Sequence, residues 1–233
     1  MSVCVIPARG GSKRIPRKNI KSFHGKPLIA YSIDCAIKSQ LFDRIIVSTD
    51  DDEIAQTAKE YGAEIPFVRP AELADDHANT FDLLQHAALW VQHHAPAASL
   101  MCCLYATAPF VQLDDLVRGF KLLNESDDAD YVYAITEFPF PIQRSIRKQH
   151  DFVRPCFPEN MYKRSQDLET TYHDAGQFYW GRVAAFAEQR AFFADRSKGI
   201  ELPRYRVVDI DTPEDWDVAE VQYQVLLASG KLL

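Results

Sequence analysis

Short apolar runs of strand length alternate with longer amphipathic segments along most of this 233-residue chain. Strands are expected at residues 3–6, 44–49, 65–68, 99–104, 131–136, 176–180 and 204–211. Helices are expected at residues 27–39, 50–61, 80–91, 113–123 and 213–227. This alternation predicts an α/β fold with a parallel sheet, helices on both faces and right-handed crossovers. Ligands are then expected beyond the carboxyl ends of the strands.

The alternation breaks between residues 137 and 172. This stretch is rich in Pro, Arg, Gln and aromatic residues and lacks helical periodicity. It is expected either to cover a binding site or to form a dimerisation arm. Because no linker sets it apart, we expect a single domain over residues 1–233 with an excursion at about 137–172.

Composition narrows the class of protein. The net charge of −7 disfavours nonspecific nucleic-acid binding, which needs a basic surface. The apolar runs are too short for a transmembrane span, and the N-terminus lacks the regions of a signal peptide. Five scattered cysteines without a Cys-x-x-Cys spacing are expected to be buried thiols rather than disulfides or zinc ligands. These features predict a cytoplasmic protein with no nucleic-acid or membrane partner.

A basic loop follows the first expected strand: the first 33 residues contain no acidic side chain, whereas residues 9–26 contain seven Lys or Arg. Gly10 and Gly11 would let backbone N–H groups approach a phosphate, and Ser12 could donate a hydroxyl hydrogen bond. The segment matches neither G-x-G-x-x-G nor G-x-x-x-x-G-K-[ST], which disfavours a dinucleotide site and a P-loop. It therefore predicts a polyphosphate site of another kind. The cations available to neutralise the phosphates are Arg9, Lys13, Arg14, Arg17 and Lys18.

Two aspartates, Asp209 and Asp211, end the last expected strand. Because side chains two residues apart on a strand share one face, the two carboxylates are expected to point the same way. Carboxylate oxygens with room left for water and phosphate suit magnesium. Thr212, Pro213 and Asp215 also have the spacing of a helix N-cap, so an acid here could be a capping residue instead.

Taken together, the loop and the aspartate pair resemble the CMP-sugar synthetase family, the cytidylyltransferases that activate nonulosonic acids. The opening segment IPARGGSKRIPRKN at residues 6–19 is similar to the signature of that family. Further similar segments are FDRIIVSTD at 42–50, VRPAEL at 68–73, TAP at 107–109 and DIDT at 209–212. The resemblance implies a Rossmann-like fold of the nucleotide-diphospho-sugar transferase type. Its sheet would be mostly parallel and flanked by helices, with an irregular dimerisation or lid excursion.

Some segments look closer to the pseudaminic acid branch of the family than to its sialic acid branch. They are LYATAPF at 104–110, YKRSQDL at 162–168 and YHDAGQFYW at 172–180. Sialic acid synthetases typically carry Gln where Tyr105 stands, and an Asn-Gly pair near Ala175 and Gly176. The resemblance therefore implies pseudaminic acid as the acceptor of CMP from CTP. The alternatives are N-acetylneuraminic, legionaminic or deoxy-octulosonic acid or, outside the enzymes, a nucleotide-binding regulatory module without turnover.

The resemblance also implies roles for individual residues. Those implied to hold the triphosphate are Arg9, Gly10, Gly11, Ser12 and Lys13. Arg9 and Lys18 are implied as catalytic, with Lys18 at the α-phosphate, where charge changes during transfer. Those implied to recognise cytosine and ribose are Asn19, Arg69 and Thr80. Those implied to hold the acidic sugar are Tyr105, Arg164, Gln166 and Gly176, with Arg164 suited to the sugar carboxylate.

The implied reaction is an in-line attack of the sugar C2 hydroxyl on the α-phosphorus of CTP, with diphosphate as the leaving group. Mg²⁺ on Asp209 and Asp211 is the expected cofactor, binding phosphate oxygens and assisting ionisation of the hydroxyl. The sequence shows no obvious general base, so the metal-assisted route is an inference by elimination. A homodimer is also implied, in which residues 137–172 could reach the neighbour's site.

Overall fold

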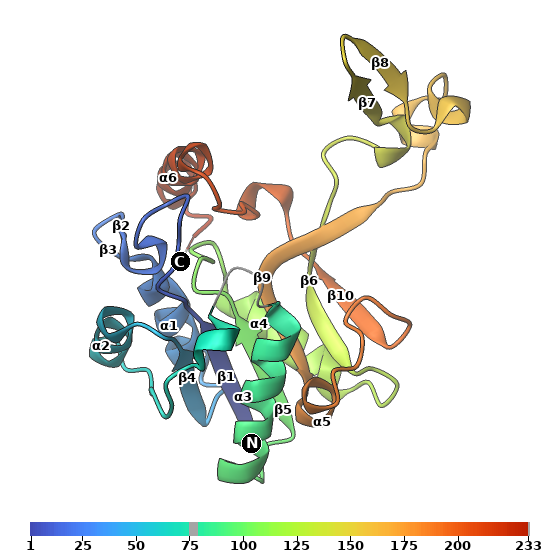
Figure 1. Ribbon diagram of the computed structural model, residues 1–233. Helices are drawn as coiled ribbons and strands as arrows, with labels where there is room; N and C mark the ends of the chain where they lie inside the picture. The colour runs from blue at the N-terminus through green and yellow to red at the C-terminus, as the bar shows by residue number, and fades with distance from the viewer. Residues whose placement is uncertain (75–78, 233) are drawn as a thin grey trace.

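The computed structural model describes residues 1–74 and 79–232, and its centre is a six-stranded sheet (Figure 1). The strands in spatial order are β10 (Ser197–Glu201), β6 (Tyr131–Glu137), β9 (Tyr172–Arg182), β5 (Leu100–Leu104), β1 (Ser2–Pro7) and β4 (Arg44–Ser48). β1 runs parallel to β4 and β5, and β6 runs parallel to β10. β9 is antiparallel to its neighbours β5 and β6. The prediction of a mostly parallel α/β sheet is confirmed.

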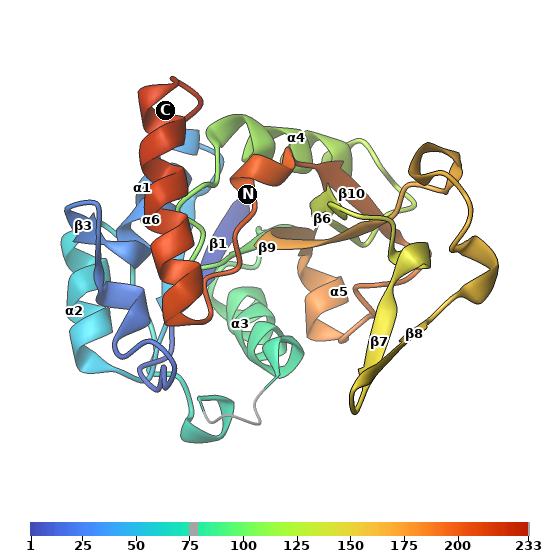
Figure 2. The same cartoon turned by 90° about the horizontal axis from the view of Figure 1, so that it is seen from above.

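Helices cover both faces of the sheet (Figure 2). Those on one face are α1 (Leu28–Ser39), α2 (Asp52–Glu60) and α4 (Leu113–Asn124), and those on the other are α3 (Thr80–His94) and α5 (Val183–Ala187). Alternate residues of β1 divide between the two cores, with Cys4 and Ile6 in the first and Val3 and Val5 in the second. Among the described residues, no helix combines the length and hydrophobicity that a membrane-spanning segment needs.

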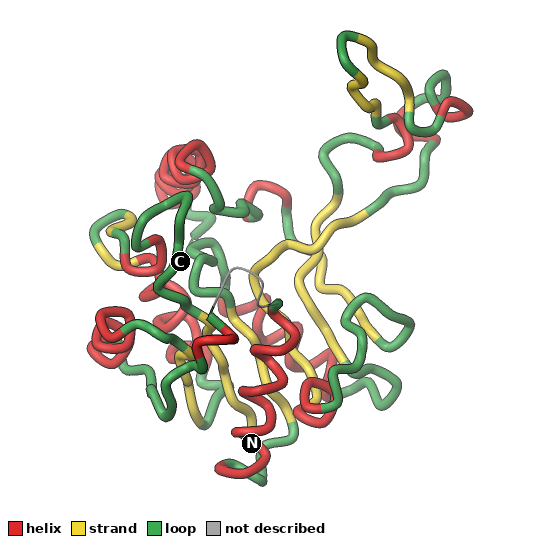
Figure 3. Tube along the Cα trace, viewed as in Figure 1, coloured by secondary structure: helices red, strands yellow, loops and turns green. Residues whose placement is uncertain are grey.

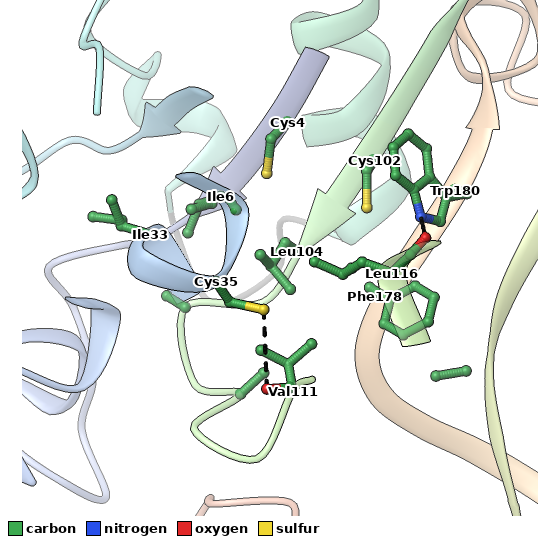
Figure 4. Packing of buried hydrophobic residues seen from close by; sticks show 14 of the residues in the cluster. Cys4, Ile6, Ile33, Cys35, Cys102, Leu104, Val111, Leu116, Phe178 and Trp180 are labelled. Atoms are coloured by element: carbon green, nitrogen blue, oxygen red, sulfur yellow. Dashed lines mark hydrogen bonds between the residues drawn. The ribbon is translucent and has the colours of Figure 1, made fainter. Parts of the chain in front are cut away.

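The cysteines follow the same division. The core between the sheet and helices α1 and α4 contains Cys4, Cys35 and Cys102 (Figure 4). Cys103 lies in the core on the opposite side of the sheet. Burial raises the pKa of the Cys35 thiol to about 12, so this thiol stays protonated at neutral pH. Buried thiols are therefore confirmed for these four residues, while Cys156 is exposed.

The final helix, α6 (Pro213–Ala228), begins with a complete capping box. The Thr212 hydroxyl accepts a hydrogen bond from the Asp215 backbone N–H at 3.2 Å. The Asp215 carboxylate accepts one from the Thr212 backbone N–H at 2.7 Å. The capping interpretation is thus confirmed for Asp215. α6 packs against a small hairpin formed by β2 (Ser22–Phe23) and β3 (Lys26–Pro27).

The prediction of a strand at residues 65–68 is wrong. After α2 the chain forms one bridge to β4, between Glu64 and Ile46, and no ladder follows it. Pro66 lacks the N–H that would continue the pairing, and Val68 is 73% exposed rather than buried in a sheet.

The strand expected at residues 204–211 is also wrong. Residues Arg204–Arg206 form a 3₁₀ turn (η6), and residues 207–211 after it have no ladder partner within the described part of the chain. The edge position beside β6 belongs instead to β10, which the sequence analysis does not predict. Gly199 of β10 lies so close to Ile135 that a Cβ there would be 2.5 Å from its side chain. This glycine weakens the apolar strand pattern in the sequence, and a larger residue in its place would force the Ile135 side chain to move.

A projecting arm, residues 138–171, leaves the sheet between β6 and β9 (Figures 1 and 3). The two strands pair as far as Glu137 opposite Tyr172, which explains why β9 is antiparallel. The arm holds the hairpin β7 (Ile146–Gln149) and β8 (Phe152–Pro155) and the 3₁₀ turns η3 (Ile142–Arg144), η4 (Pro158–Asn160) and η5 (Ser165–Asp167). All residues of β7 are exposed. A two-stranded hairpin exposed in this way is only marginally stable alone.

Candidate active site

A pocket of about 600 Å³ opens beyond the carboxyl ends of β1 and β5, at the start of α3. This is the location expected for a ligand in such a sheet. Predicted residues from the basic loop and just after it that line the pocket are Arg9, Ser12, Lys13, Lys18 and Asn19. Predicted residues from the rest of the chain that line it are Arg69, Thr80, Tyr105, Asp209 and Asp211. The fold therefore gathers residues from distant segments into one pocket.

The basic loop is fastened to the turn between β4 and α2. The Gly10 backbone N–H donates to the Asp50 carboxylate at 3.0 Å. Arg17 has a left-handed backbone conformation, with φ of 57°, and its guanidinium pairs with Asp51 and Glu53. Asp51 is also the N-cap of α2. The structure thus gives Arg17 an anchoring position away from the pocket, rather than one beside the expected phosphates.

The two loop glycines differ in the space around them. A Cβ on Gly10 would lie 2.7 Å from Oδ2 and 2.9 Å from Cβ of Asp51, whereas a Cβ on Gly11 meets no described atom within 4 Å. Gly10→Ala is therefore expected to shift the loop in the free protein and to destabilise it by about 1–3 kcal/mol, as overpacking does. CTP affinity should also fall about tenfold.

Gly11→Ala is the matched control, because it should leave the unfolding temperature unchanged. A loss of CTP affinity in that variant would report close approach of a phosphate to the Gly11 backbone. Thermal unfolding and calorimetric titration with CTP measure both effects. An unfolding temperature of Gly10→Ala equal to that of wild type would contradict the close packing of Gly10 against Asp51.

Lys18 connects the loop to the aspartate segment, residues 207–211. Its Nζ donates to the Ile210 carbonyl at 2.6 Å and lies 3.2 Å from Oδ1 of Asp211, which is 193 positions away in the sequence. The Lys18 side chain is only 17% exposed. Arg14 pairs with Oδ2 of the same carboxylate at 2.6 Å. Two motifs from opposite ends of the chain therefore meet through Lys18 and Arg14, which both contact Asp211.

Asp209 and Asp211 both line the pocket, although the aspartate segment is not a strand. Loss of hydration raises the pKa of Asp209, and repulsion from Asp211 raises it further. A divalent cation would relieve this repulsion, and carboxylate oxygens suit Mg²⁺, so the residues fit that metal. Among the described residues, no cluster of three or more His, Cys, Asp or Glu could hold a metal ion. Water and phosphate oxygens would have to complete the coordination of a bound Mg²⁺.

The residues expected to recognise the nucleoside surround the same pocket. The Arg69 guanidinium is buried, and it donates to the side-chain and main-chain oxygens of Ser48. Burial lowers the pKa of Arg69 to about 10, so it remains a cation at neutral pH. Thr80 is the first residue of α3. Asn19 lines the pocket and donates its side-chain N–H to the Arg9 carbonyl at 2.9 Å.

The residues expected to hold the sugar are divided between two places. Tyr105 lines the pocket, and burial raises its pKa to about 12, so its phenol stays neutral. The Tyr105 backbone N–H donates to the Gln177 carbonyl at 2.9 Å. Gly176 of β9 directly precedes Gln177, so it lies near Tyr105 in space. Arg164 and Gln166 lie on the arm, which projects away from the body (Figure 1), and the Arg164 side chain is 72% exposed. One copy of the chain therefore does not bring these two residues to its own pocket.

Three further pocket residues have no individual role in the sequence-based assignment. Arg14 belongs to the basic run, but nothing in the sequence separates it from Arg17. Asn79 lines the pocket as the N-cap of α3, a role that its position before an apolar helix could have indicated. Leu83 contributes apolar surface from the same helix, and its sequence pattern is that of an ordinary core residue.

The sequence matches the family model described as cytidylyltransferase over residues 3–226. A pseudaminic acid cytidylyltransferase from Campylobacter jejuni is 44% identical over 225 residues, covering 96% of this chain and 97% of the relative. A CMP-N,N'-diacetyllegionaminic acid synthase from Legionella pneumophila is 30% identical over 229 residues, covering 94% of each protein.

A solved structure of CMP:2-keto-3-deoxy-manno-octonic acid synthetase complexed with CTP is similar to this chain, with a TM-score of 0.69. The match covers 97% of this chain and 99% of the other at 17% identity. At that identity the likeness concerns the fold, and it agrees with the mostly parallel, helix-flanked sheet.

Proposed function

The chain belongs to the cytidylyltransferase family, and we propose that it transfers CMP from CTP to pseudaminic acid and releases diphosphate. The observation that carries nucleotidyl transfer is the contact of Lys18 with Asp211 and the Ile210 carbonyl, because it joins a basic loop to a carboxylate pair. Support for the sugar comes from the 44% identity to a pseudaminic acid cytidylyltransferase, against 30% to a legionaminic acid enzyme. The cytoplasm, which supplies CTP and keeps thiols reduced, is the proposed location.

In the proposed reaction the C2 hydroxyl oxygen of the sugar bonds to the α-phosphorus, and the bond from that phosphorus to the diphosphate oxygen breaks. The hydroxyl proton passes to solvent, because no general base is assigned among the described residues that line the pocket. Arg9, Ser12 and Lys13 would hold the triphosphate, with Gly10 and Gly11 shaping the loop. Lys18 would stabilise the charge that develops at the α-phosphate. Catalysis is then mostly positioning and charge neutralisation.

Mg²⁺ is the proposed cofactor, with Asp209 and Asp211 as the residues that would hold it. When bound, it would neutralise phosphate charge and make the sugar hydroxyl more acidic. The raised pKa of Asp209 beside Asp211 supports this assignment, because a nearby cation favours the ionised form of both carboxyls. Arg14 and Lys18 already neutralise Asp211 in the free protein, so they would have to share it with the metal.

A homodimer is the proposed assembly, with the arm as its contact. Phe140, Phe152 and Val153 of the arm are 80%, 74% and 63% exposed, so burial against a second copy would remove apolar surface from water. In such a dimer Arg164 and Gln166 of one copy would reach the pocket of the other copy, close to the Tyr105 that lines it. Analytical ultracentrifugation should show a dimer at micromolar concentration, and a monomer there would contradict the assembly.

The experiment that tests the substrate offers CTP and Mg²⁺ with one acidic sugar at a time and measures diphosphate. Pseudaminic acid should give a kcat/KM at least about tenfold above that of N-acetylneuraminic, legionaminic or deoxy-octulosonic acid, equivalent to about 1.4 kcal/mol. A higher value for another sugar would replace pseudaminic acid as the substrate. Binding of CTP without diphosphate release from any sugar would favour a nucleotide-binding regulatory module.

A further inference from the structure

Among the described residues the aspartate segment has no sheet partner, so contacts other than a β-ladder must hold it in place. Its far end is fixed by the cap of α6, where the Asp215 carboxylate accepts the Asp211 backbone N–H at 3.1 Å. Ile210 in the middle is buried, with 1% exposure. The near end follows η6, and the buried residue of that turn is Arg206.

Arg206 is fastened to α4 by a buried ion pair. Its Nη1 contacts Oδ2 of Asp115, and its Nη2 donates to Oδ1 at 3.4 Å. The side chains of Arg206 and Asp115 are only 10% and 3% exposed. The Arg206 main chain is held as well, since the Gln177 side-chain N–H donates to its carbonyl at 2.5 Å. Both the sheet and α4 therefore fix the backbone three residues before Asp209.

A buried ion pair is a poor source of net stability, because desolvation of two charges offsets most of their attraction. The ion pair instead fixes geometry, because two charge-assisted hydrogen bonds from a rigid guanidinium allow only one position of the arginine relative to the carboxylate. We propose that Asp115 and Arg206 are positioning residues, which hold the aspartate segment so that Asp209 and Asp211 face the phosphates. This inference rests on the proposed nucleotidyl transfer.

Arg118 provides a matched control on the same carboxylate. It pairs with Oδ1 of Asp115 at 3.0 Å, but its side chain is 50% exposed and it contacts the Glu201 carbonyl rather than the aspartate segment. Removing Arg118 therefore weakens the charge environment of Asp115 without releasing residues 207–211. Removing Arg206 releases them.

The test compares Arg206→Met with Arg118→Met in two measurements on the intact chain. Hydrogen exchange of the backbone amides at 207–211, followed by mass spectrometry without substrate, should be at least about tenfold faster in Arg206→Met and unchanged in Arg118→Met. In turnover, kcat for diphosphate release should fall about tenfold in Arg206→Met with KM for CTP unchanged, and both should be unchanged in Arg118→Met.

Wild-type exchange rates at 207–211 in Arg206→Met would overturn the proposal whatever the activity. A higher KM for CTP with kcat unchanged in Arg206→Met would overturn it as well. If Arg206→Met fails to fold because the buried Asp115 carboxylate keeps only the half-exposed Arg118 as its partner, Asp115→Asn combined with Arg206→Met takes its place under the same criteria. Absence of turnover in the wild type, with fast exchange only in the Arg206 variants, would instead reject the proposed function and leave the anchoring role standing.

Discussion

Replacing Lys18 with alanine should lower kcat for diphosphate release about 100-fold. The ammonium group is held in the pocket by the Ile210 carbonyl and Asp211, with little exposure to water. A fixed cation of this kind acts on the charge that develops at the reacting phosphorus, and loss of one such group costs about 100-fold to 1,000-fold. The rate is measured by coupled detection of diphosphate with CTP, Mg²⁺ and pseudaminic acid at saturation.

Lys21→Ala is the matched control for Lys18. Lys21 lies in the same basic stretch, but its Nζ sits 3.9 Å from the centre of the Trp216 ring and it does not line the pocket. Its removal should change kcat less than about twofold while lowering stability slightly, as loss of a surface cation–π contact does. A decrease of less than about tenfold for Lys18→Ala, or an equal decrease for both variants, would contradict the role of Lys18.

Asp211→Asn should abolish Mg²⁺-dependent turnover, with a loss of about 100-fold or more. The substitution keeps the size of the side chain and removes the charge, and metal catalysis of this kind supplies several kcal/mol. The carboxylate is 39% exposed, so the fold should persist, as far-UV circular dichroism can verify. Asp217→Asn on α6 is the control, because Asp217 is exposed and outside the pocket. Activity like that of wild type in Asp211→Asn would reject the metal assignment.

The alternation of apolar runs was enough to predict the layered fold, because burial on both faces of a sheet dictates both the runs and their spacing. The same pattern led to wrong predictions where a proline or a glycine changes what the backbone can do. Pro66 prevents a ladder in the apolar segment at residues 65–68. Gly199 lies in the polar segment at residues 197–201, whose pattern does not indicate the edge strand that forms there.

Asp209 and Asp211 line the pocket, although the strand expected to end with them does not form. Both side chains reach the pocket from a stretch of chain without ladder partners among the described residues, so its position depends on other anchors. The anchors of that chain could not be read from the sequence. Asp115 and Arg206 are 91 positions apart, and each has the pattern of a solvated surface charge until the fold buries it.

Residues of like charge in the basic loop lie in different places. Charge alone cannot separate Arg14, which faces the pocket, from Arg17, which turns away to Asp51 and Glu53. The left-handed turn at Arg17 makes that difference, and it depends on contacts with α2. Arg164 and Gln166 on the arm remain predictions, since their place in a site depends on a second copy of the chain.

We expect this pocket to join the C2 oxygen of pseudaminic acid to the α-phosphorus of CTP. Pseudaminic acid labelled with ¹⁸O at the C2 hydroxyl, incubated with CTP, Mg²⁺ and the purified protein, tests it by mass spectrometry. The expected product is CMP-pseudaminic acid that carries the label, formed together with an equal amount of unlabelled diphosphate. Absence of the CMP-sugar, or a CMP-sugar without the label, would contradict it.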